Sequence, residues 1–555
     1  MANLPGTEPN LLDKVIAFAA PTWAVERHKS RMVLAMSGGY TGARRDRRET
    51  RDFNPRATSA DESVSGDLPT LRARSRDLVR NAPLAAGGIN NIVKNTCATG
   101  LSAHPQPDLA VLGWTEEQGL AFSEQMYAHF DRWASSRDCD LTRTQNHYEL
   151  QPLWVRCTLE SGDCFALTPM VSLPNSPYKT RVQIVEADRV ASPNGDGKTS
   201  EYGKKADGTP LITAVLNGGV EKDEFGAPLA YCILRKHPSS IGFWSRTVEW
   251  DRYLAFGPKT GRRNVLHGFD RLRPDQSRGV PILAPVIEPI LQLRRYTDNE
   301  VMAAVVTSMF TVFIKTEAEA NYQPPAAVQQ GLVPEMALGN GTINQLGQNE
   351  DVTFANPNRP STTFDPFVQA ILKQIGMCLN LPYEVLTMSF TASYSAARGA
   401  MLEAWKFYLE RRSFLVNSFC QPTYEALMDE LVASGAISAP GYFRDPILRA
   451  AYQRCDWVGD AMASIDVEKD VRAAAAKVEN GFSSIERETM KLESVSSRDV
   501  HRQRTREHQQ RVNDGLEPPI LGATATEMLT PPGEDAGQDD SEDETQQDKQ
   551  KGGGK

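Results

Sequence analysis

The most enzyme-like spacing in this chain is Gly197-Lys198-Thr199, the residue order that ends a phosphate-binding loop. Such a loop surrounds phosphate with backbone N–H groups, and it needs glycine at the position that Ser192 occupies here. Pro193 follows directly and has no N–H to donate. We therefore interpret residues 193–208 as a polar loop between strands and predict no nucleotide hydrolysis.

The histidines and carboxylates also lack the spacing of a catalytic or metal site. The eight histidines include no HExxH pattern and no His/Cys cluster at ligand spacing. His501 and His508 would share a helix face, but arginines surround them. No GxSxG motif is present, and Asp539 and Asp540 lie in a nearly apolar-free tail that offers no environment for tuning their pKa values. The sequence predicts no catalytic residue, no metal and no cofactor.

Size and composition limit the classes of protein that remain. With 555 residues the chain exceeds a single core, so three or four units are expected, and 40% apolar residues fit a globular protein. The net charge of −9 argues against a protein that coats nucleic acid, but not against one that lets nucleic acid slide past. Eight scattered cysteines without a CxxC pair indicate a reducing compartment. The most apolar run, Val301 to Ile314, is too short for a bilayer, so no membrane partner is expected.

In the N-terminal half of the chain, apolar residues recur first at the spacing of helices and then at every second position, as in strands. Residues 1–60 look loosely ordered, and their cluster Arg44 to Arg51 is either a solvated segment or a contact for an acidic partner or DNA. Helical spacing predicts helices over Ser75 to Thr96 and Glu116 to Ser135. In the second helix the predicted core stripe is Phe122, Met126, Phe130 and Trp133.

The region from His147 to Phe256 is predicted to be β-rich, because apolar residues alternate with polar ones. The strand patterns are clearest at Arg181 to Ile184 and at Leu229 to Arg235.

After Pro281 the pattern becomes helical again. One helix is predicted to run through Ile314, and a turn-rich insert follows over Thr316 to Ser361. A second helix covers Phe364 to Leu379, with Phe367, Ile371, Ile375 and Leu379 on one face.

A serine- and threonine-rich break, Thr387 to Ser395, precedes a longer helix that reaches Gly435 and must kink around Pro422. Residues 440–515 are predicted to form a smaller helical unit, and the acidic end of the chain should stay unfolded.

Five segments in this order resemble the portal proteins of lambda-like tailed phages, in register from about residue 10 to 515. These segments are IVEADRV (Ile184 to Val190), GVEKDEFGAPLAYCI (Gly219 to Ile233), NVLHGFDRLRPDQSRGVPILAPVI (Asn264 to Ile287), LNLPYEVL (Leu379 to Leu386) and YSAARGAMLEAWKFYLERR (Tyr394 to Arg412). The resemblance implies an α+β portal fold in a ring, usually of twelve subunits, at one capsid vertex. The segments it implies are a wing (61–280), a stem helix (281–315), a clip (316–363), a second stem helix (364–380), a tunnel loop (381–395), a long kinked wing helix (396–438) and a crown (439–517). Composition predicts a flexible arm (1–60) before them and a disordered acidic tail (518–555) after them, and the resemblance does not include this tail.

The resemblance also implies partners and contact residues. The clip would dock the terminase large subunit, which carries the motor ATPase, and later head-completion or connector proteins, through Gln329, Gln330, Asn340, Asn344 and Gln348. Major capsid or scaffold protein would surround the ring, and double-stranded DNA would pass through it without sequence preference. The expected location is the virion, after assembly in the host cytoplasm.

The tunnel segment offers hydroxyl groups and aromatic rings but no lysine or arginine until just beyond it. Its expected channel residues are Thr387, Ser389, Phe390, Thr391, Ser393, Tyr394, Ser395 and Arg398.

Two alternatives stay open at this stage. One is another capsid-associated minor head or connector protein, against which the clip-like insert argues. The other is a nuclease or ATPase, which the missing motifs weaken.

Overall fold

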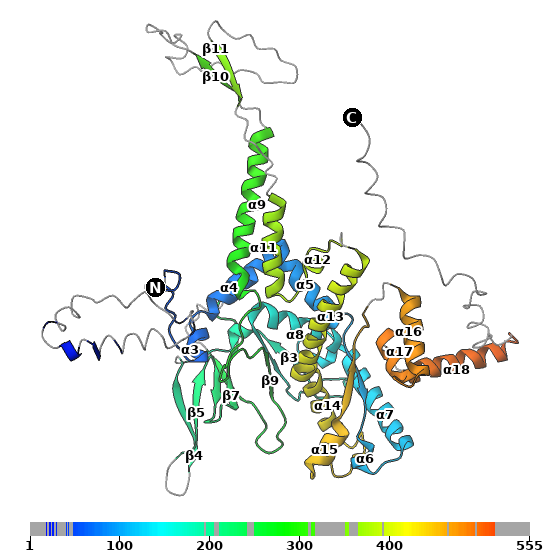
Figure 1. Ribbon diagram of the computed structural model, residues 1–555. Helices are drawn as coiled ribbons and strands as arrows, with labels where there is room; N and C mark the ends of the chain where they lie inside the picture. The colour runs from blue at the N-terminus through cyan, green and yellow to red at the C-terminus, as the bar shows by residue number, and fades with distance from the viewer. Residues whose placement is uncertain are drawn as a thin grey trace, which may run out of the picture. The chain divides into compact units, whose positions relative to one another are not determined.

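The structure is a computed structural model that describes residues 48–193, 196–204, 210–240, 249–308, 312–316, 350–354, 364–390, 393–462, 466–493, 495 and 497–516, with scattered positions between 18 and 43. The chain forms two compact units, Met1–Gly66 and Asp67–Lys555. The first contains α3 (Ala60–Ser65), and the second combines helices with antiparallel sheets, which confirms the α+β class (Figure 1). None of the described helices combines the length and the apolarity that crossing a bilayer requires.

Two helices, rather than one, occupy the region of the first predicted helix. They are α4 (Leu68–Asn81) and α5 (Pro83–Cys97), so the prediction of a continuous helix over Ser75 to Thr96 is wrong at one point. Ala82 is extended because a following proline disfavours the helical conformation, and Pro83 then begins α5.

Helix α7 (Glu116–Ser135) has the predicted bounds. A capping box closes its first turn, because Thr115 accepts a hydrogen bond from the N–H of Gln118, whose side chain accepts one from the N–H of Thr115. The predicted stripe is buried: Phe122, Met126, Phe130 and Trp133. The short α6 (Leu109–Leu112) precedes this helix.

The predicted β-rich region begins with a helix instead. Helix α8 (His147–Ser161) starts at a second capping box, formed by Asn146 and Glu149, so the strand prediction is wrong from His147 to Ser161. Its buried residues recur at helical spacing, but His147 and Gln151 are among them, and two polar residues obscure the apolar pattern.

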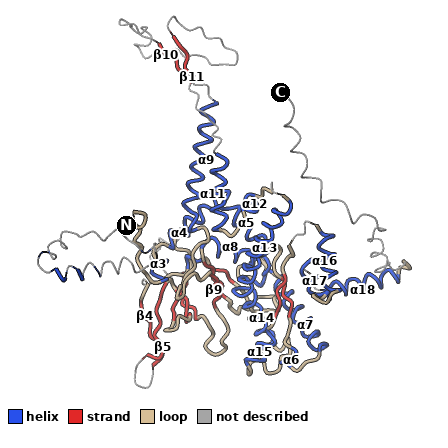
Figure 2. The backbone as a smooth tube through the Cα atoms, in the orientation of Figure 1, coloured by secondary structure: helices blue, strands red, loops and turns tan. Residues whose placement is uncertain are grey.

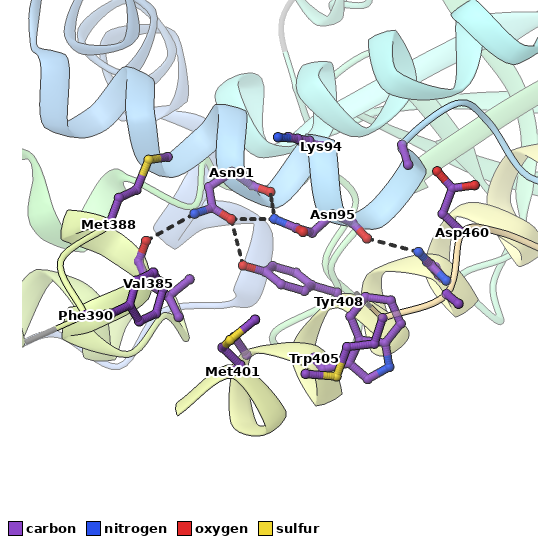
Figure 3. A pocket seen from close by; sticks show the side chains of 15 residues that line it. Asn91, Lys94, Asn95, Val385, Met388, Phe390, Met401, Trp405, Tyr408 and Asp460 are labelled. Carbon is purple, nitrogen blue, oxygen red and sulfur yellow. Dashed lines mark hydrogen bonds between the residues drawn. The ribbon is translucent and has the colours of Figure 1, made fainter. Parts of the chain in front are cut away.

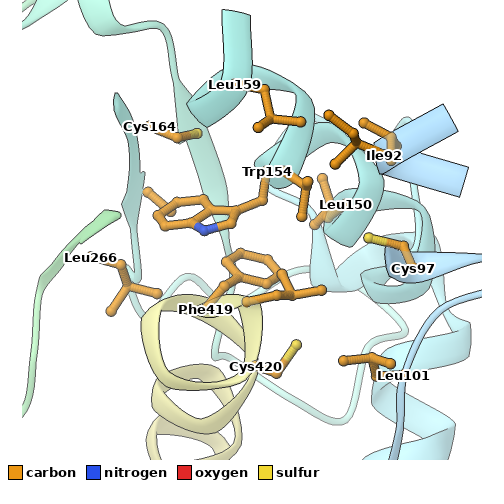
Figure 4. Close-up of a cluster of buried hydrophobic side chains, with 14 of the residues drawn as sticks. Ile92, Cys97, Leu101, Leu150, Trp154, Leu159, Cys164, Leu266, Phe419 and Cys420 are labelled. Atoms are coloured by element: carbon orange, nitrogen blue, oxygen red, sulfur yellow. The ribbon is translucent and has the colours of Figure 1, made fainter. Parts of the chain in front are cut away.

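The long C-terminal helix changes its hydrogen-bonding pattern just before Pro422. Helix α13 (Tyr394–Leu415) leads into a π-helical turn, η6 (Val416–Cys420), and then into α14 (Gln421–Ala433). Proline has no N–H for the regular pattern, and this irregularity lies where the kink was predicted. The turn carries Phe419 into the core, where its ring stacks on Trp154 with centroids 5.0 Å apart (Figure 4).

Two antiparallel sheets follow α8 (Figure 2). The first has the order β3 (Gln183–Val185), β2 (Asp163–Leu167), β9 (Val265–Phe269). The second has the sequential order β4 (Lys198–Lys204), β5 (Pro210–Asn217), β6 (Val220–Lys222), β7 (Pro228–Leu234), β8 (Trp250–Leu254). The strands predicted near Ile184 and Leu229 are therefore confirmed. The prediction of a loop over 193–208 is wrong across Lys198–Lys204, because this polar stretch pairs with β5.

The segment 440–515 was predicted to be helical throughout, and this is wrong at one strand. After α15 (Pro446–Gln453), β12 (Cys455–Val458) pairs antiparallel with β1 (Ser102–Pro105). Four residues are too few for a periodic signal, so only the partner strand reveals β12. The helices α16 (Val467–Glu479), α17 (Ile485–Glu493) and α18 (Ser497–Asn513) follow it.

Two further helices flank the insert. Helix α9 (Ile287–Ser308) follows the short η5 (Ala284–Val286), and α11 (Phe364–Cys378) ends one residue before its predicted end. The predicted extension of the first helix to Ile314 is wrong, because β10 (Val312–Thr316) pairs with β11 (Glu350–Phe354). Its residues Val312, Phe313 and Ile314 have high strand propensity.

Candidate functional site

Helices α9 and α11 lie side by side as a pair, with the insert between them in sequence (Figure 1). Tyr296 of α9 joins them, because its ring contacts Phe364 and Phe367 of α11 at centroid distances of 5.4 and 5.0 Å. Burial falls along the pair: Ile290 is 3% exposed, whereas Met302 is 64% exposed. The predicted face of α11 behaves likewise, since Ile375 is buried and Phe367 is half exposed. The pair thus has a buried base and an apolar surface open to solvent.

A buried charge cluster fixes the chain just before this base. Asp163 of β2 is fully buried between Arg278 Nε at 2.5 Å and an Arg72 guanidinium nitrogen at 2.8 Å. These two cations hold the pKa of Asp163 far below its usual range, although burial alone would raise it. Arg278 also donates to the carbonyl oxygens of Ala187, Val190 and Gly218. The segment that enters η5 and α9 is therefore tied to both sheets.

Helix α12 (Tyr383–Thr387) connects α11 to the predicted tunnel loop. Thr387 ends α12, and its hydroxyl donates to the carbonyl of Tyr383 at 2.8 Å, so this hydroxyl is already used within the helix. Met388 then takes a left-handed conformation at φ 54°, which turns the chain out of α12, and the N–H of Ser389 returns to Glu384 O at 3.1 Å. The loop therefore starts from a closed helix end.

The remaining predicted channel residues separate into exposed and engaged groups. Ser393 and Ser395 are exposed, with their hydroxyl oxygens 3.2 Å apart, and Thr391 lies outside the described residues. Tyr394 is half exposed at the start of α13. Arg398 is not a free cation, since its guanidinium lies 3.0 Å from Asp470 of α16. Hydrogen bonds to Tyr394 and Asp470 raise the pKa of Arg398. The structure thus brings the serines to the surface and neutralises the arginine.

Phe390 lines a cavity of about 360 Å³ between α5, α12 and α13 (Figure 3). A polar ladder crosses this site: Asn91 donates to Val385 O at 3.1 Å and accepts from Tyr408 at 2.8 Å and from Asn95 at 2.6 Å. Burial raises the pKa of Tyr408 to about 12, which keeps its hydroxyl a donor at neutral pH.

At the other end of the cavity, Arg412 lies 4.8 Å from the Trp405 ring centroid and donates to the carbonyl of Thr96 at 2.9 Å. These contacts attach the helices on both sides of the loop to α5. Sequence reasoning missed Asn91, Asn95 and Asp470, because only their partners on other helices give them a role.

The five predicted docking residues of the insert, Gln329, Gln330, Asn340, Asn344 and Gln348, lie outside the described residues.

One group of metal-ligand type occurs among the described residues. Oxygen and nitrogen atoms of Glu186, Asp188 and His237 lie within 4.8 Å of one another. Arg76 already forms ion pairs with both carboxylates, at 3.2 Å for Glu186 and closer for Asp188. A protein cation therefore occupies the place that a metal ion would take.

Comparison with known proteins places the sequence in a family. The family model "Phage portal protein, lambda family" matches residues 46–412. Portal protein B of Escherichia phage lambda is 24% identical over 503 residues, covering 86% of this chain and 91% of that protein. The portal protein of Escherichia phage N15 is 24% identical over 514 residues, covering 88% and 92%. Among solved structures, a chain in the neck of a native GTA particle covers 76% of this chain and 94% of its own length, with a TM-score of 0.40 and 12% identity. The family match covers more than half of the chain, including both helices of the α9–α11 pair and most of α13, and on that ground the chain belongs to the lambda family of phage portal proteins.

Proposed function

We propose that copies of this chain, most simply twelve, close into a ring whose channel passes double-stranded DNA into and out of the capsid. The observation that carries this proposal is the exposed apolar surface of the α9–α11 pair, where Val301, Met302, Val305 and Phe367 are open to solvent in the single chain. Apolar surface of this kind marks an interface, and a head-to-tail interface closes into a ring when its rotation divides a circle.

The channel is proposed to let DNA slide rather than hold it. Each phosphate that a protein cation neutralises adds affinity through counterion release. The described part of the tunnel segment has serine hydroxyls instead of cations, and the nearest arginine, Arg398, is paired with Asp470. The net charge of −9 per chain also disfavours tight binding of DNA. We assign no catalytic step to this chain, and the packaging motor belongs to its terminase partner.

The insert between α9 and α11 is proposed to dock the terminase large subunit and later the connector proteins. It lies between two paired helices in sequence, and its turn-rich composition suits an exposed binding element. Capsid or scaffold protein would contact the wing in the virion, after ring assembly in the host cytoplasm.

Native mass spectrometry of the purified full chain tests the ring. The expected result is one closed oligomer with a central pore in electron micrographs, whereas a persistent monomer or dimer at high concentration would contradict the proposal. A second measurement tests docking: replacing residues 317–349 by a glycine-serine linker should abolish terminase pulldown while rings still form. Terminase binding that survives this replacement would show that the insert is not the docking element.

A further inference from the structure

A second cavity, of about 460 Å³, lies on the wing far in sequence from the tunnel loop. It is formed by α14, the start of α15, the segment before α15 and the loop between β8 and β9. Half of its twelve lining residues are charged: Lys259, Arg262, Asp429, Glu430, Arg444 and Arg449.

Both carboxylates of this cavity already have partners. Asp429 receives two hydrogen bonds from one nitrogen of Arg449, each at 2.9 Å, and one from Tyr442 at 2.8 Å. Glu430 accepts the backbone N–H groups of Lys179 and Thr180, both at 2.7 Å. Both carboxylates are thus engaged in hydrogen bonds, and they act on the neighbouring Arg262 only through longer-range attraction.

Three cations of the cavity have no such partner. Across the described part of the chain, no carboxylate lies within the 4.0 Å of an ion pair from Lys259, Arg262 or Arg444. Arg262 is half buried, its Nε has no hydrogen-bond partner, and its closest polar contact is Thr180 Oγ1 at 3.5 Å. Burial lowers the pKa of Arg262, and the attraction of Asp429 and Glu430 offsets this effect only in part. A buried cation whose charge is incompletely balanced is costly, so an anion in direct contact with it would be stabilising.

The chain itself contains an acidic segment whose charge is opposite to that of these three cations. Eight acidic residues and no basic residue occur from Glu534 to Asp548. The described residues end at Leu516, and the 18 residues from there to Glu534 can span up to about 60 Å. Exposed apolar side chains at the rim of the cavity, Met170 and Phe443, suit the apolar residues Met528 and Leu529 that precede the acids.

We propose that this cavity is a binding site for the acidic segment 534–548 of the chain, whose carboxylates pair with Lys259, Arg262 and Arg444. This inference does not depend on the channel, since the cavity and the tail lie outside the tunnel segment. It gives the acidic tail a docked state on this cavity, within one chain or between neighbouring copies.

Zero-length carbodiimide coupling of the intact, assembled chain tests the site, because it joins a lysine amine only to a carboxylate in contact with it. The expected product is an amide between Lys259 and a carboxylate of 534–548, located by mass spectrometry. Arg262→Gln with Arg444→Gln should lower the yield at least about tenfold, as charge-assisted contacts are lost. Raising the salt concentration should lower it in the parent protein. Mixing isotopically labelled copies then shows whether the tail comes from the same or a neighbouring subunit.

The matched control is Arg454→Gln, a neutralised arginine just after α15 that lies 3.9 Å from Asp108 and outside the cavity; it should leave the yield unchanged. Arg444→Gln alone keeps the test valid if the Arg262 variant folds poorly, since Arg444 is exposed. The proposal is wrong if Lys259 couples to no carboxylate of the tail, or if the arginine variants couple as well as the parent. If duplex DNA shields Lys259 from acetylation while no tail coupling occurs, the cavity binds phosphates instead.

Discussion

The core around Trp154 and the α9–α11 pair are both built from helices with apolar faces, but these faces are buried in the core and largely exposed in the pair. In the core, α8 and η6 bury Trp154 and Phe419 completely, and the indole N–H donates to Ser418 at 3.0 Å. In the pair, only the base is buried, and Met302 stays 64% exposed. The core is thus complete within one chain, whereas the pair leaves apolar surface exposed that the proposed ring would cover. Variants in the two regions should therefore separate folding from assembly.

The largest expected effect is Trp154→Ala. Removing this side chain leaves a cavity beneath Phe419 and removes the hydrogen bond that the Ser418 hydroxyl oxygen accepts, which should lower the free energy of unfolding by about 3–5 kcal/mol. Urea unfolding followed by circular dichroism measures it. A loss below about 1 kcal/mol would mean that the core does not depend on this contact.

A smaller, pH-dependent effect should come from His147, which is fully buried beside Phe419 with its Nε2 2.9 Å from Thr423 Oγ1. Burial lowers the pKa of His147 to about 3. The unfolded chain takes up this proton near pH 6.5 while the folded chain does not. The stability contribution is therefore complete above about pH 6.5 and is lost, by about 1.4 kcal/mol per pH unit, as the pH falls toward 3.

The parent protein should thus lose about 2 kcal/mol between pH 6.5 and 5 through this group. His147→Gln is expected to be less stable at pH 8 but to lose less stability over the same interval. Equal slopes for the two proteins would show that His147 does not titrate in this way.

These two regions also show what could be predicted from the sequence. Helices α7 and α11 were predicted nearly to the residue, because each carries a continuous apolar stripe. Helix α8 was missed because its buried face includes Gln151, which pairs with both backbone groups of Leu101, at 2.7 and 3.1 Å. The spacing of apolar residues within one segment does not reveal that a polar side chain is buried by hydrogen bonds to another segment.

The candidate site was predictable only in part, for the same reason. The break between helices near residues 387–395 was predicted from its composition, whereas its role as a tunnel loop comes from the family resemblance and stays a prediction. The neutralisation of Arg398 depends on Asp470, and the placement of the loop depends on Asn91, and both contacts join segments far apart in sequence.

The α9 substitutions Met302→Ser and Val305→Ser should change the stability of a single chain little, within about 0.5 kcal/mol, because both side chains are already exposed. They should nevertheless reduce the fraction of closed rings in native mass spectrometry, since the apolar surface would be lost from the interface. Phe225→Ser is the matched control, because Phe225 is 85% exposed between β6 and β7 and lies outside the pair. If the α9 variants form rings as well as Phe225→Ser does, the exposed surface of the pair is not needed for assembly, and the pair does not differ from the core in this way.

The smallest effect on folding is expected from Ser393→Arg. Ser393 is exposed, caps no helical N–H group, and contacts only Ser395 among the polar partners that the structure describes. Its hydroxyl can give a phosphate a neutral hydrogen bond worth about 0.5–1.5 kcal/mol, whereas a charged donor would give roughly 1.5–3 kcal/mol. Because Arg398 is already paired with Asp470, the new arginine would be the first free cation of this segment among the described residues. Repeated around a ring, it should hold the duplex and slow packaging while rings form normally.

Single-molecule packaging rates across a salt series measure this effect, and the defect should ease as salt screens the phosphate contacts. Ser393→Gln is the control, because it adds a long polar side chain without charge and should package at nearly the parent rate. If the glutamine variant is as slow as the arginine variant, steric crowding is the cause and the charge argument fails. If the arginine variant packages normally at low salt, the loop does not touch DNA. In that case the constriction of the channel lies elsewhere, and the exposed serines at the start of α13 have no part in DNA passage.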